Sequence, residues 1–347
     1  MNLFVSAYCL TGDSWSTGLL RAGTCALALA GALPCPVSAQ TEWRPSHNVE
    51  IIVQAGAGGA SDRTARLMQR IIQNGRLVEA STTVINKAGG GGVLAYSYIN
   101  QHPGDGHFWM VSSGTLLTSY VSGQSTFKHT EFTPLAILAT EYPAFLVRED
   151  SSIKTGGDLL NRLVKGDTPP AIAMSPGLGN ANHIALAMAV RAAGGNGKRL
   201  KIVAFNSASE TMTALLGGHV EVVVSPASPA LPYLASGKVR AVAVSSGQRL
   251  GGVMAGVPTW REQGVDAVFG NWRGVLGPKG MSDAQIDYWG RVFARLTASP
   301  EWKDEIEKNL LTELFMDGRQ SRKFIDAEYK EVSVIMKDIG LAKQPAL

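Results

Sequence analysis

The chain has 347 residues, of which 45% are hydrophobic, 17% charged and 7% aromatic. That length predicts about two domains with cores of their own, and so apolar a composition excludes a disordered chain. The net charge of +4 is small, and the basic residues are scattered rather than interleaved with aromatic ones. We therefore expect no nucleic-acid partner, whereas the mild positive bias suits small anions.

The N-terminal segment has the pattern of a secretory signal. Arg21 precedes an apolar run over 22–33, and a small-x-small cleavage site follows at 37–39. The run is too short to span a bilayer. We therefore interpret residues 1–39 as a cleavable signal peptide of a secreted protein, and the alternative is a buried helix of a cytosolic protein.

All three cysteines, Cys9, Cys25 and Cys35, lie in that segment. The processed chain would therefore have no disulfide, no thiol nucleophile and no cysteine–zinc site. The six histidines have no metal-ligand spacing, so we predict neither a metal site nor a cofactor. No later stretch reaches the ~18 consecutive apolar residues of a membrane span, and the processed protein is expected to be soluble.

In chain order, the first series of predicted elements alternates strand and helix. Strands are expected at 49–54, 82–86 and 108–112, and helices at 61–74 and from the end of the glycine run 89–92 to about 101. The helix at 61–74 rests on apolar residues at helical spacing and ends at Gly75. This order predicts a parallel sheet with helices on both faces.

A second α/β series begins near Tyr142. Its strands are expected at 144–147, 171–174, 201–205, 220–224 and 239–244, and its helices at 180–193 and 209–216. A short strand at 274–276 and a helical tail over 282–340 complete the chain. Because a lone helical tail needs a sheet to cover, we assign it to the first series. The expected architecture is two α/β lobes with crossings near 142 and 266, one lobe comprising 44–142 and 266–347 and the other 143–265.

Two glycine-rich loops, at 54–62 and 175–183, each lie between a predicted strand and a predicted helix. Glycines let the backbone approach a ligand closely, and the start of the helix supplies unpaired N–H groups and a positive dipole end. Because ligands of α/β sheets bind at the carboxyl ends of strands, both loops are expected to face one cleft and to bind an anion. The alternative for each loop is a tight helix N-terminus capped by Ser61 or Asn180.

The other candidate binding residues lie beside these loops. Arg273, at the second crossing, can take a carboxylate bidentately, and the alternative is a solvated arginine at the start of a strand. His183 lies one turn into its helix, where a packed or capping histidine is an equal alternative. The ligand-binding set is Gly58, Gly59, Ser61, Ser113, Ser175, Gly177, Gly179, Asn180, His183, Asn206, Ser207 and Arg273.

Motifs for catalysis are missing from the sequence. The glycines of the first loop nearly match the dinucleotide fingerprint G-x-G-x-x-G, but Ser61 replaces the third glycine and Asn86 stands where the ribose-binding acid belongs. The sequence has no H-E-x-x-H, G-x-S-x-G or P-loop motif. We therefore predict no catalytic residues, and a secreted hydrolase or nucleotide enzyme is the remaining alternative.

Several ordered motifs resemble the periplasmic solute receptors of tripartite tricarboxylate transporters, the Bug receptors. The motifs are Gly58-Gly59-Ala60-Ser61-Asp62 with Arg66, and the stretches 86–92, 103–106, 175–183, 215–220, 236–244 and 257–259. The resemblance spans roughly residues 44–343. It implies a two-lobed type II periplasmic binding protein with a two-segment hinge, whose lobes close on a small carboxylate and deliver it to membrane permease subunits. It also implies that the two glycine loops hold the ligand carboxylate through backbone amides, hydroxyls and ordered waters.

The resemblance also bears on the ligand. The stretch 272–281 is most similar to the tricarboxylate-type members, which implies a citrate-like di- or tricarboxylate. Ala204-Phe205-Asn206-Ser207 stands where the family often has Pro-Tyr-Lys-Gly, so a hydroxyl and an ammonium are absent there, and Ile85 replaces a common glutamate. The receptor is expected to be a monomer and not an enzyme. The alternative with the same fold is a sensor that presents a carboxylate to a membrane kinase.

Overall fold

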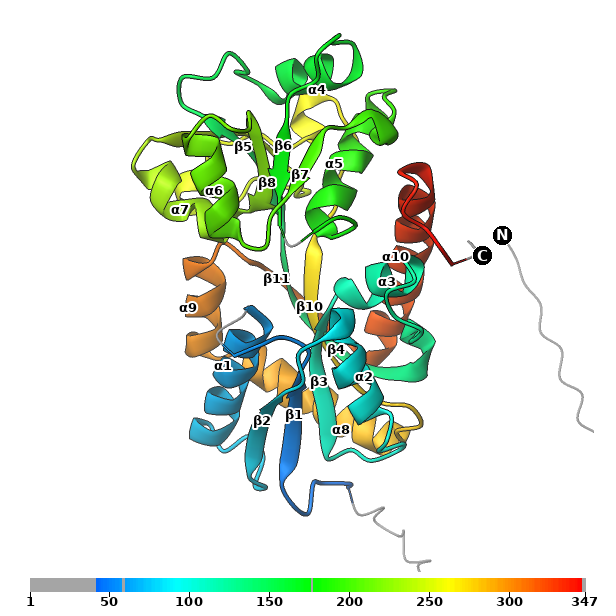
Figure 1. The fold of residues 1–347 in the computed structure, drawn as a ribbon. Coiled ribbons are helices and arrows are strands. Elements are labelled where there is room, and N and C mark those ends of the chain that lie inside the picture. Colours follow the sequence, from blue (N-terminus) through cyan, green and yellow to red (C-terminus); the bar gives the residue numbers. More distant parts are fainter. Residues whose placement is uncertain (1–41, 58–59, 176, 345–347) are drawn as a thin grey trace, which may run out of the picture. The chain divides into compact units, whose positions relative to one another are not determined.

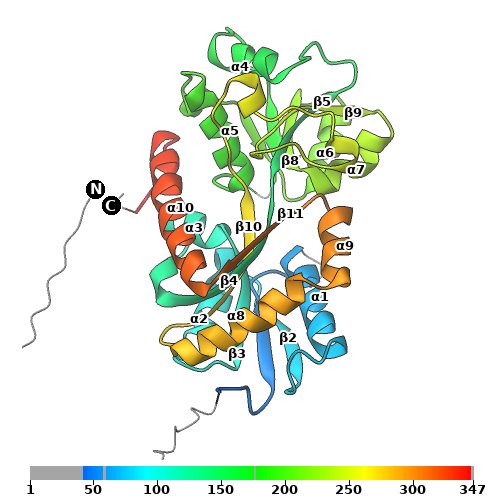
Figure 2. The ribbon, with the colours of Figure 1, turned by 180° about the vertical axis from the view of Figure 1, so that it is seen from behind.

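The computed structural model describes residues 42–57, 60–175 and 177–344. The predicted signal peptide lies outside the described residues, as do Gly58 and Gly59 of the first glycine loop. From Glu42 onward the chain forms one compact unit with two β-sheets (Figures 1 and 2). Among the described residues, no helix combines the length and the apolar character needed to cross a membrane.

The first sheet has six strands in the order β11-β4-β10-β3-β1-β2. Their bounds are β1 Val49–Val53, β2 Thr82–Asn86, β3 Phe108–Ser113, β4 Phe132–Glu141, β10 Asn271–Pro278 and β11 Thr312–Asp317. β1 pairs in parallel with β2 and β3, as predicted, whereas β10 is antiparallel to β3 and β4, and β11 is antiparallel to β4. The sheet is therefore mixed rather than wholly parallel. The reason is that the chain leaves it along β4 and returns along β10, so these two paired strands run in opposite directions.

The second sheet has five strands in the order β7-β6-β8-β5-β9. Their bounds are β5 Pro143–Arg148, β6 Ile172–Met174, β7 Ile202–Ala204, β8 Val222–Pro226 and β9 Val239–Val244. β6 is parallel to β7 and β8, and β5 is antiparallel to β8 and β9. β5 begins two residues after β4 ends, so the two sheets are joined by almost continuous strand.

Ten α-helices are present among the described residues. They are α1 Ala60–Asn74, α2 Val93–Ile99, α3 Thr115–Val121, α4 Gly156–Val164, α5 Ala181–Ala192, α6 Ala208–Leu216, α7 Ala227–Ala235, α8 Asp283–Thr297, α9 Pro300–Lys308 and α10 Gly318–Asp338. Short 3₁₀ turns add η1 Gly90–Gly92, η2 His129–Glu131, η3 Gly197–Arg199, η4 Gly252–Met254 and η5 Arg261–Gln263. The sequence did not predict α3, α4, α7 or β4.

Helices cover both faces of each sheet. Val49, Ile51 and Val53 of β1 pack in an apolar cluster with α1, α8 and α9, whereas Ile52 packs in a second cluster with α2, α3 and α10. Successive side chains of a strand point to opposite faces, so this short β-branched run is buried on both sides. In the second sheet, α6 and α7 cover one face and α4 and α5 the other.

The tail that the sequence predicts as helical over 282–340 contains a strand. β11 separates α9 from α10 and, as the edge strand of the sheet, pairs with β4. Before it the chain turns at Leu310, whose φ of 50° lies in the left-handed region. Apolar residues at helical spacing precede and follow this short edge strand, so the sequence does not predict it. Its formation depends on the partner strand and not on local propensity. α8 and α10 pack against β4, so this tail covers the first sheet.

Candidate functional site

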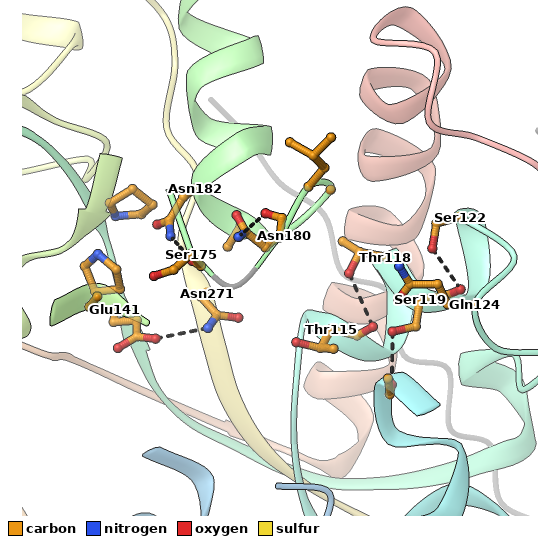
Figure 3. A pocket seen from close by; sticks show the side chains of 18 of the residues that line it. Thr115, Thr118, Ser119, Ser122, Gln124, Glu141, Ser175, Asn180, Asn182 and Asn271 are labelled. Atoms are coloured by element: carbon orange, nitrogen blue, oxygen red, sulfur yellow. Dashed lines mark hydrogen bonds between the residues drawn. The ribbon is translucent and has the colours of Figure 1, made fainter. Parts of the chain in front are cut away.

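A cavity of about 430 Å³ is lined by residues of both sheets and their helices (Figure 3). On one side are Ser175 and residues 177–182 of the second glycine loop, with the starts of three helices of the second sheet. On the other side are α3, η1, the end of β4 at Glu141 and the start of β10 at Asn271. The cavity therefore lies at the carboxyl ends of β3 and β6, the position at which α/β sheets bind their ligands.

The glycine loop after β6 has a tightly specified shape. Gly177 and Gly179 have φ of +72° and +78°, a conformation that glycine adopts without strain. Asn180 caps α5, since its Oδ1 accepts a hydrogen bond from the His183 N–H at 3.0 Å and its Nδ2 donates to the Gly177 carbonyl at 3.0 Å. Asn182 Nδ2 donates to the carbonyl of Ser175, also at 3.0 Å. These side-chain bonds fix the shape of the loop, and the Gly177 N–H donates in addition to the Phe205 carbonyl at 3.4 Å.

Three helix N-termini converge on the cavity. Asn180 is the cap of α5, Ala208 is the first residue of α6, and Pro226 precedes α7, and all three line the cavity. The positive end of each helix dipole contributes about 0.3–1 kcal/mol toward a nearby negative charge. Among the described lining residues the only charged side chain is that of Glu141. An anion bound here would therefore be held by dipoles, N–H groups and neutral side chains.

The opposite wall is a hydroxyl-bearing face of α3. Thr115, Thr118 and Ser119 of this helix and its C-cap residue Ser122 line the cavity (Figure 3). Ser119 Oγ donates to the Gly91 carbonyl at 3.1 Å, which fixes η1 beside the helix. Hydroxyl groups both donate and accept hydrogen bonds, so this wall suits the carboxylate and hydroxyl groups of a ligand. Their i, i+3, i+4, i+7 spacing is visible in the sequence, and that signal was not used in predicting the site.

Arg273 does not line the cavity. Its Nη2 donates to Glu141 Oε2 at 2.7 Å, and its Nη1 donates to Thr64 Oγ1 at 3.0 Å and to the Ala60 carbonyl at 3.3 Å. Glu141 also accepts from Asn271 Nδ2 at 3.0 Å. The guanidinium thus joins β4, β10 and the first turn of α1, and the carboxylate it binds, through Nη2 alone, is that of Glu141 and not of a ligand.

The described residues of the first glycine loop do not line the cavity, although Ala60 contacts Arg273, whose partner Glu141 does. Ser61 lies in the first turn of α1, and none of residues 54–57 or 60–62 lines the cavity. Asp62 is buried, and its two carboxylate oxygens accept from Asn86 Nδ2 at 2.9 Å and from Arg66 Nε at 3.0 Å. These contacts make Asp62 a structural anchor of this loop. The wall that faces the 175–182 loop is formed by α3.

The chain matches the family described as "Tripartite tricarboxylate transporter family receptor" over residues 68–341. This chain belongs to that family. Among similar proteins, the UPF0065 protein in gbd 5'region of Cupriavidus necator is 25% identical over 326 residues, covering 93% of this receptor and 96% of that protein. Protein BugT of Bordetella pertussis is 25% identical over 338 residues, covering 90% of this receptor and 95% of BugT.

Solved structures show the same two-lobed fold. A TctC solute binding protein from Polaromonas is 24% identical with a TM-score of 0.74, covering 84% of this receptor and 99% of that chain. Rpa4515 of R. palustris with adipate is 20% identical with a TM-score of 0.72, covering 86% and 99%. MatC of Rhodopseudomonas palustris with bound malate is 21% identical with a TM-score of 0.62, covering 85% and 97%.

The remaining predicted site residues of the receptor support the walls of the cavity. Ser113 is buried, and its Oγ donates to Thr115 Oγ1 at 3.1 Å. Ser207 caps α6 by accepting from the Glu210 N–H at 3.3 Å, and the N–H of Asn206 donates to the Glu210 carboxylate at 3.1 Å. Neither Ser113, Asn206 nor Ser207 is among the described lining residues. Of the predicted set, Ser175, Gly177, Gly179 and Asn180 line the cavity.

His183 is hydrogen-bonded to the glycine loop but does not itself line the cavity. Its Nδ1 accepts a hydrogen bond from the Gly179 N–H at 3.1 Å, and its ring is buried. Burial lowers the pKa of His183 from 6.5 to about 4, because a charged imidazolium there would lose its hydration. The receptor therefore keeps this ring neutral, as an acceptor that shapes the Gly177–Gly179 turn.

This burial predicts a loss of stability in acid. Between pH 6.5 and 4 the unfolded chain binds a proton on His183 that the folded receptor excludes, so the free energy of unfolding falls as the pH falls. The limit is about 3 kcal/mol, at about 1.4 kcal/mol per pH unit. His183→Asn keeps an acceptor for Gly179 but does not titrate, so urea unfolding at a series of pH values should show a smaller acid loss in this variant. His219→Asn, at an exposed histidine, is the control and should follow the wild type. Equal acid losses in wild type and His183→Asn would contradict the assignment.

Proposed function

We propose that this receptor is a periplasmic, non-enzymatic binding protein that captures a small di- or tricarboxylate by lobe closure and delivers it, as a monomer, to the permease of a tripartite transporter. The cavity carries the proposal. Three helix N-termini and a row of hydroxyl groups surround it, and no cationic side chain is among its described lining residues. Such a site attracts an anion and releases it again, because no buried ion pair with the ligand has to be broken.

The ligand class is supported by three lines of reasoning. The structures with adipate and with malate hold dicarboxylates in the same fold. The commitment of Arg273 to Glu141 also favours a ligand with few charges, because the guanidinium is already neutralised. The similarity of residues 272–281 to tricarboxylate-type receptors favours a citrate-like ligand. The titration described next distinguishes a dicarboxylate from a citrate-like ligand.

The test is isothermal titration calorimetry of the purified receptor with citrate, malate, succinate and adipate. At least one of them should bind with a dissociation constant near micromolar, which corresponds to about −8 kcal/mol. Succinamide, which has the shape of succinate without its charge, should give no binding heat. If no carboxylate binds, or if succinamide binds as tightly as succinate, the proposal is wrong.

A substitution in the glycine loop tests its role in ligand binding without disrupting the fold. Gly177 has a φ of +72°, and a Cβ there would meet nothing within 4 Å, so Gly177→Ala strains the loop without a collision. A left-handed alanine costs about 1–2 kcal/mol, so the loop should relax and carboxylate affinity should fall about tenfold. Gly247→Ala is the matched control, because Gly247 is exposed, lies in the same lobe and has no positive φ. Unchanged affinity in Gly177→Ala would remove this loop from the site.

A further inference from the structure

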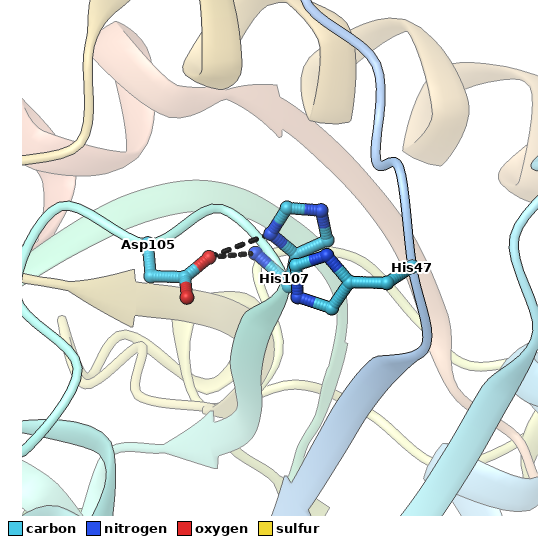
Figure 4. Close-up of side chains that lie close together, drawn as sticks. All are labelled: His47, Asp105 and His107. Atoms are coloured by element: carbon cyan, nitrogen blue, oxygen red, sulfur yellow. Dashed lines mark hydrogen bonds and ion pairs between the residues drawn. The ribbon is translucent and has the colours of Figure 1, made fainter.

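A cluster of two histidines and an aspartate lies at the amino ends of β1 and β3. His47 precedes β1 by two residues, and Asp105 and His107 immediately precede β3 (Figure 4). One ligand atom from each of the three side chains lies within 4.8 Å of the others. We propose that this cluster is a binding site for a first-row divalent transition-metal ion of the Zn²⁺ type, which fastens the segment before β1 to the start of β3.

The two imidazole rings are held close together. The rings of His47 and His107 stack with their centroids 3.5 Å apart and 18° between their planes, and the edge of Trp43 meets His107 at 5.6 Å. His107 is buried, whereas His47 is exposed. The nitrogen lone pairs lie in the planes of the rings, so for both rings to bind one ion the exposed His47 ring would turn out of this stack and point a nitrogen at the ion beside His107 Nδ1. The hydrogen bonds between Ser46 and His107 are enough to fasten this segment to β3, and they do not require a histidine at position 47.

Asp105 and His107 form a pair in which a cation can replace a proton. Asp105 Oδ1 accepts from the His107 backbone N–H at 2.9 Å and lies 2.7 Å from His107 Nδ1. A metal ion at Nδ1 displaces the proton between these two atoms to solvent. The ring then carries its proton on Nε2, which lies 3.5 Å from Ser46 Oγ, and the hydroxyl becomes its acceptor. Without metal, the Ser46 N–H donates to Nε2 at 3.0 Å. Because Ser46 is exposed, this N–H can donate to water once Nε2 carries a proton.

The donor set selects the kind of ion. Two neutral imidazoles and one carboxylate suit zinc and its neighbours, whereas calcium and magnesium prefer oxygen ligands alone. A hydrogen bond from the second ring nitrogen to a fixed acceptor is the usual support of a metal-bound histidine, and Ser46 supplies it here. Water completes the coordination on the exposed side of His47.

This site is independent of the ligand cavity. β3 runs from the cluster at Phe108 to Ser113 beside the cavity wall, so about 20 Å of strand separates the two at ~3.3 Å per residue. Metal binding should therefore stabilise the fold without changing carboxylate affinity. It ties down a segment that immediately follows the predicted cleavage site.

The experiment titrates ZnCl₂ into the purified receptor, prepared without a polyhistidine tag and stripped with EDTA, by calorimetry and by thermal unfolding. We expect one equivalent to bind and the unfolding temperature to rise. His47→Ala and Asp105→Asn should each weaken binding at least about tenfold, since loss of even an outer-shell partner costs about 10–100-fold. Both changes leave the buried His107 ring in place, and circular dichroism without metal checks that the variants are folded.

His219→Ala is the matched control, because His219 is exposed and lies outside the cluster. It should bind Zn²⁺ as the wild type does. The proposal is overturned if the wild type shows no saturable binding, if His47→Ala and Asp105→Asn bind as tightly as the wild type, or if His219→Ala alone abolishes binding.

Discussion

Glu328→Gln is expected to make the receptor more stable at pH 8 than the wild type, by up to about 5 kcal/mol. Glu328 of α10 is buried, and its Oε1 accepts a hydrogen bond from Trp272 Nε1 at 3.1 Å. Burial raises the pKa of Glu328 from 4.5 to about 8, because the carboxylate would lose its hydration. The hydrogen bond from Trp272 lowers this pKa, and the nearby charge of Glu331 raises it.

The direction follows from proton binding. Between pH 4.5 and 8 the unfolded chain releases the proton of Glu328 while the folded receptor keeps it, so wild-type stability falls as the pH rises. The gap between 4.5 and about 8, at about 1.4 kcal/mol per pH unit, sets the limit of about 5 kcal/mol. The glutamine keeps an acceptor for Trp272 and does not ionise. The advantage of the variant should therefore shrink toward pH 4.5.

The measurement is urea unfolding of both proteins at several pH values between 4.5 and 8.5. Glu331→Gln is the control, because it removes a neighbouring charge on the same helix but leaves Glu328 titratable. The free energy of unfolding of this variant should still fall toward pH 8, by most of the amount that the wild type loses. Parallel stability curves for wild type and Glu328→Gln would show that Glu328 is ionised in the folded receptor, and would contradict the prediction.

Arg273→Met is expected to lower the free energy of unfolding by about 3–5 kcal/mol, the usual cost of leaving one member of a buried ion pair alone. The side chains of Arg273 and Glu141 are 14% and 13% exposed, and the guanidinium also holds the first turn of α1 through Thr64. The same change should weaken carboxylate binding at least about tenfold, because an uncompensated Glu141 charge then faces the ligand cavity.

The double variant Arg273→Met with Glu141→Gln decides what Arg273 does. If its role is to neutralise and position Glu141, removing both charges should recover much of the stability and most of the carboxylate affinity. The coupling measured by the cycle should be about 1–3 kcal/mol. If Arg273 bound the ligand carboxylate directly, affinity would stay low in the double variant. Urea unfolding and calorimetry with the tightest-binding carboxylate measure both quantities.

The two glycine loops illustrate how far the candidate site could be predicted. The strand–glycine–helix pattern of 175–183 is local, and Ser175, Gly177, Gly179 and Asn180 do line the cavity. The same kind of pattern at 54–62 predicted the opposing wall; Gly58 and Gly59 lie outside the described residues, so this stays a prediction, and α3 forms the wall that is described. Local sequence shows that a loop can turn closely before a helix; it does not show which surface that loop will face.

Sequence alone determined the features that depend on near neighbours. Apolar spacing predicted α1, and β-branched runs predicted β1, β2 and β9, because their periodicity is carried by consecutive residues. The ordered motifs also predicted the receptor family, which the match over 68–341 confirmed.

Only the tertiary structure decided the contacts between residues far apart in the chain. Arg273 meets Glu141 because β10 pairs with β4, and His47 meets His107 because β1 pairs with β3. β11 likewise exists because an edge of β4 was available to pair with. Strand register sets which side chains become neighbours, and register is a property of the whole packed sheet. For that reason the charge balance of the cavity and the histidine cluster had no signal in the order of the residues.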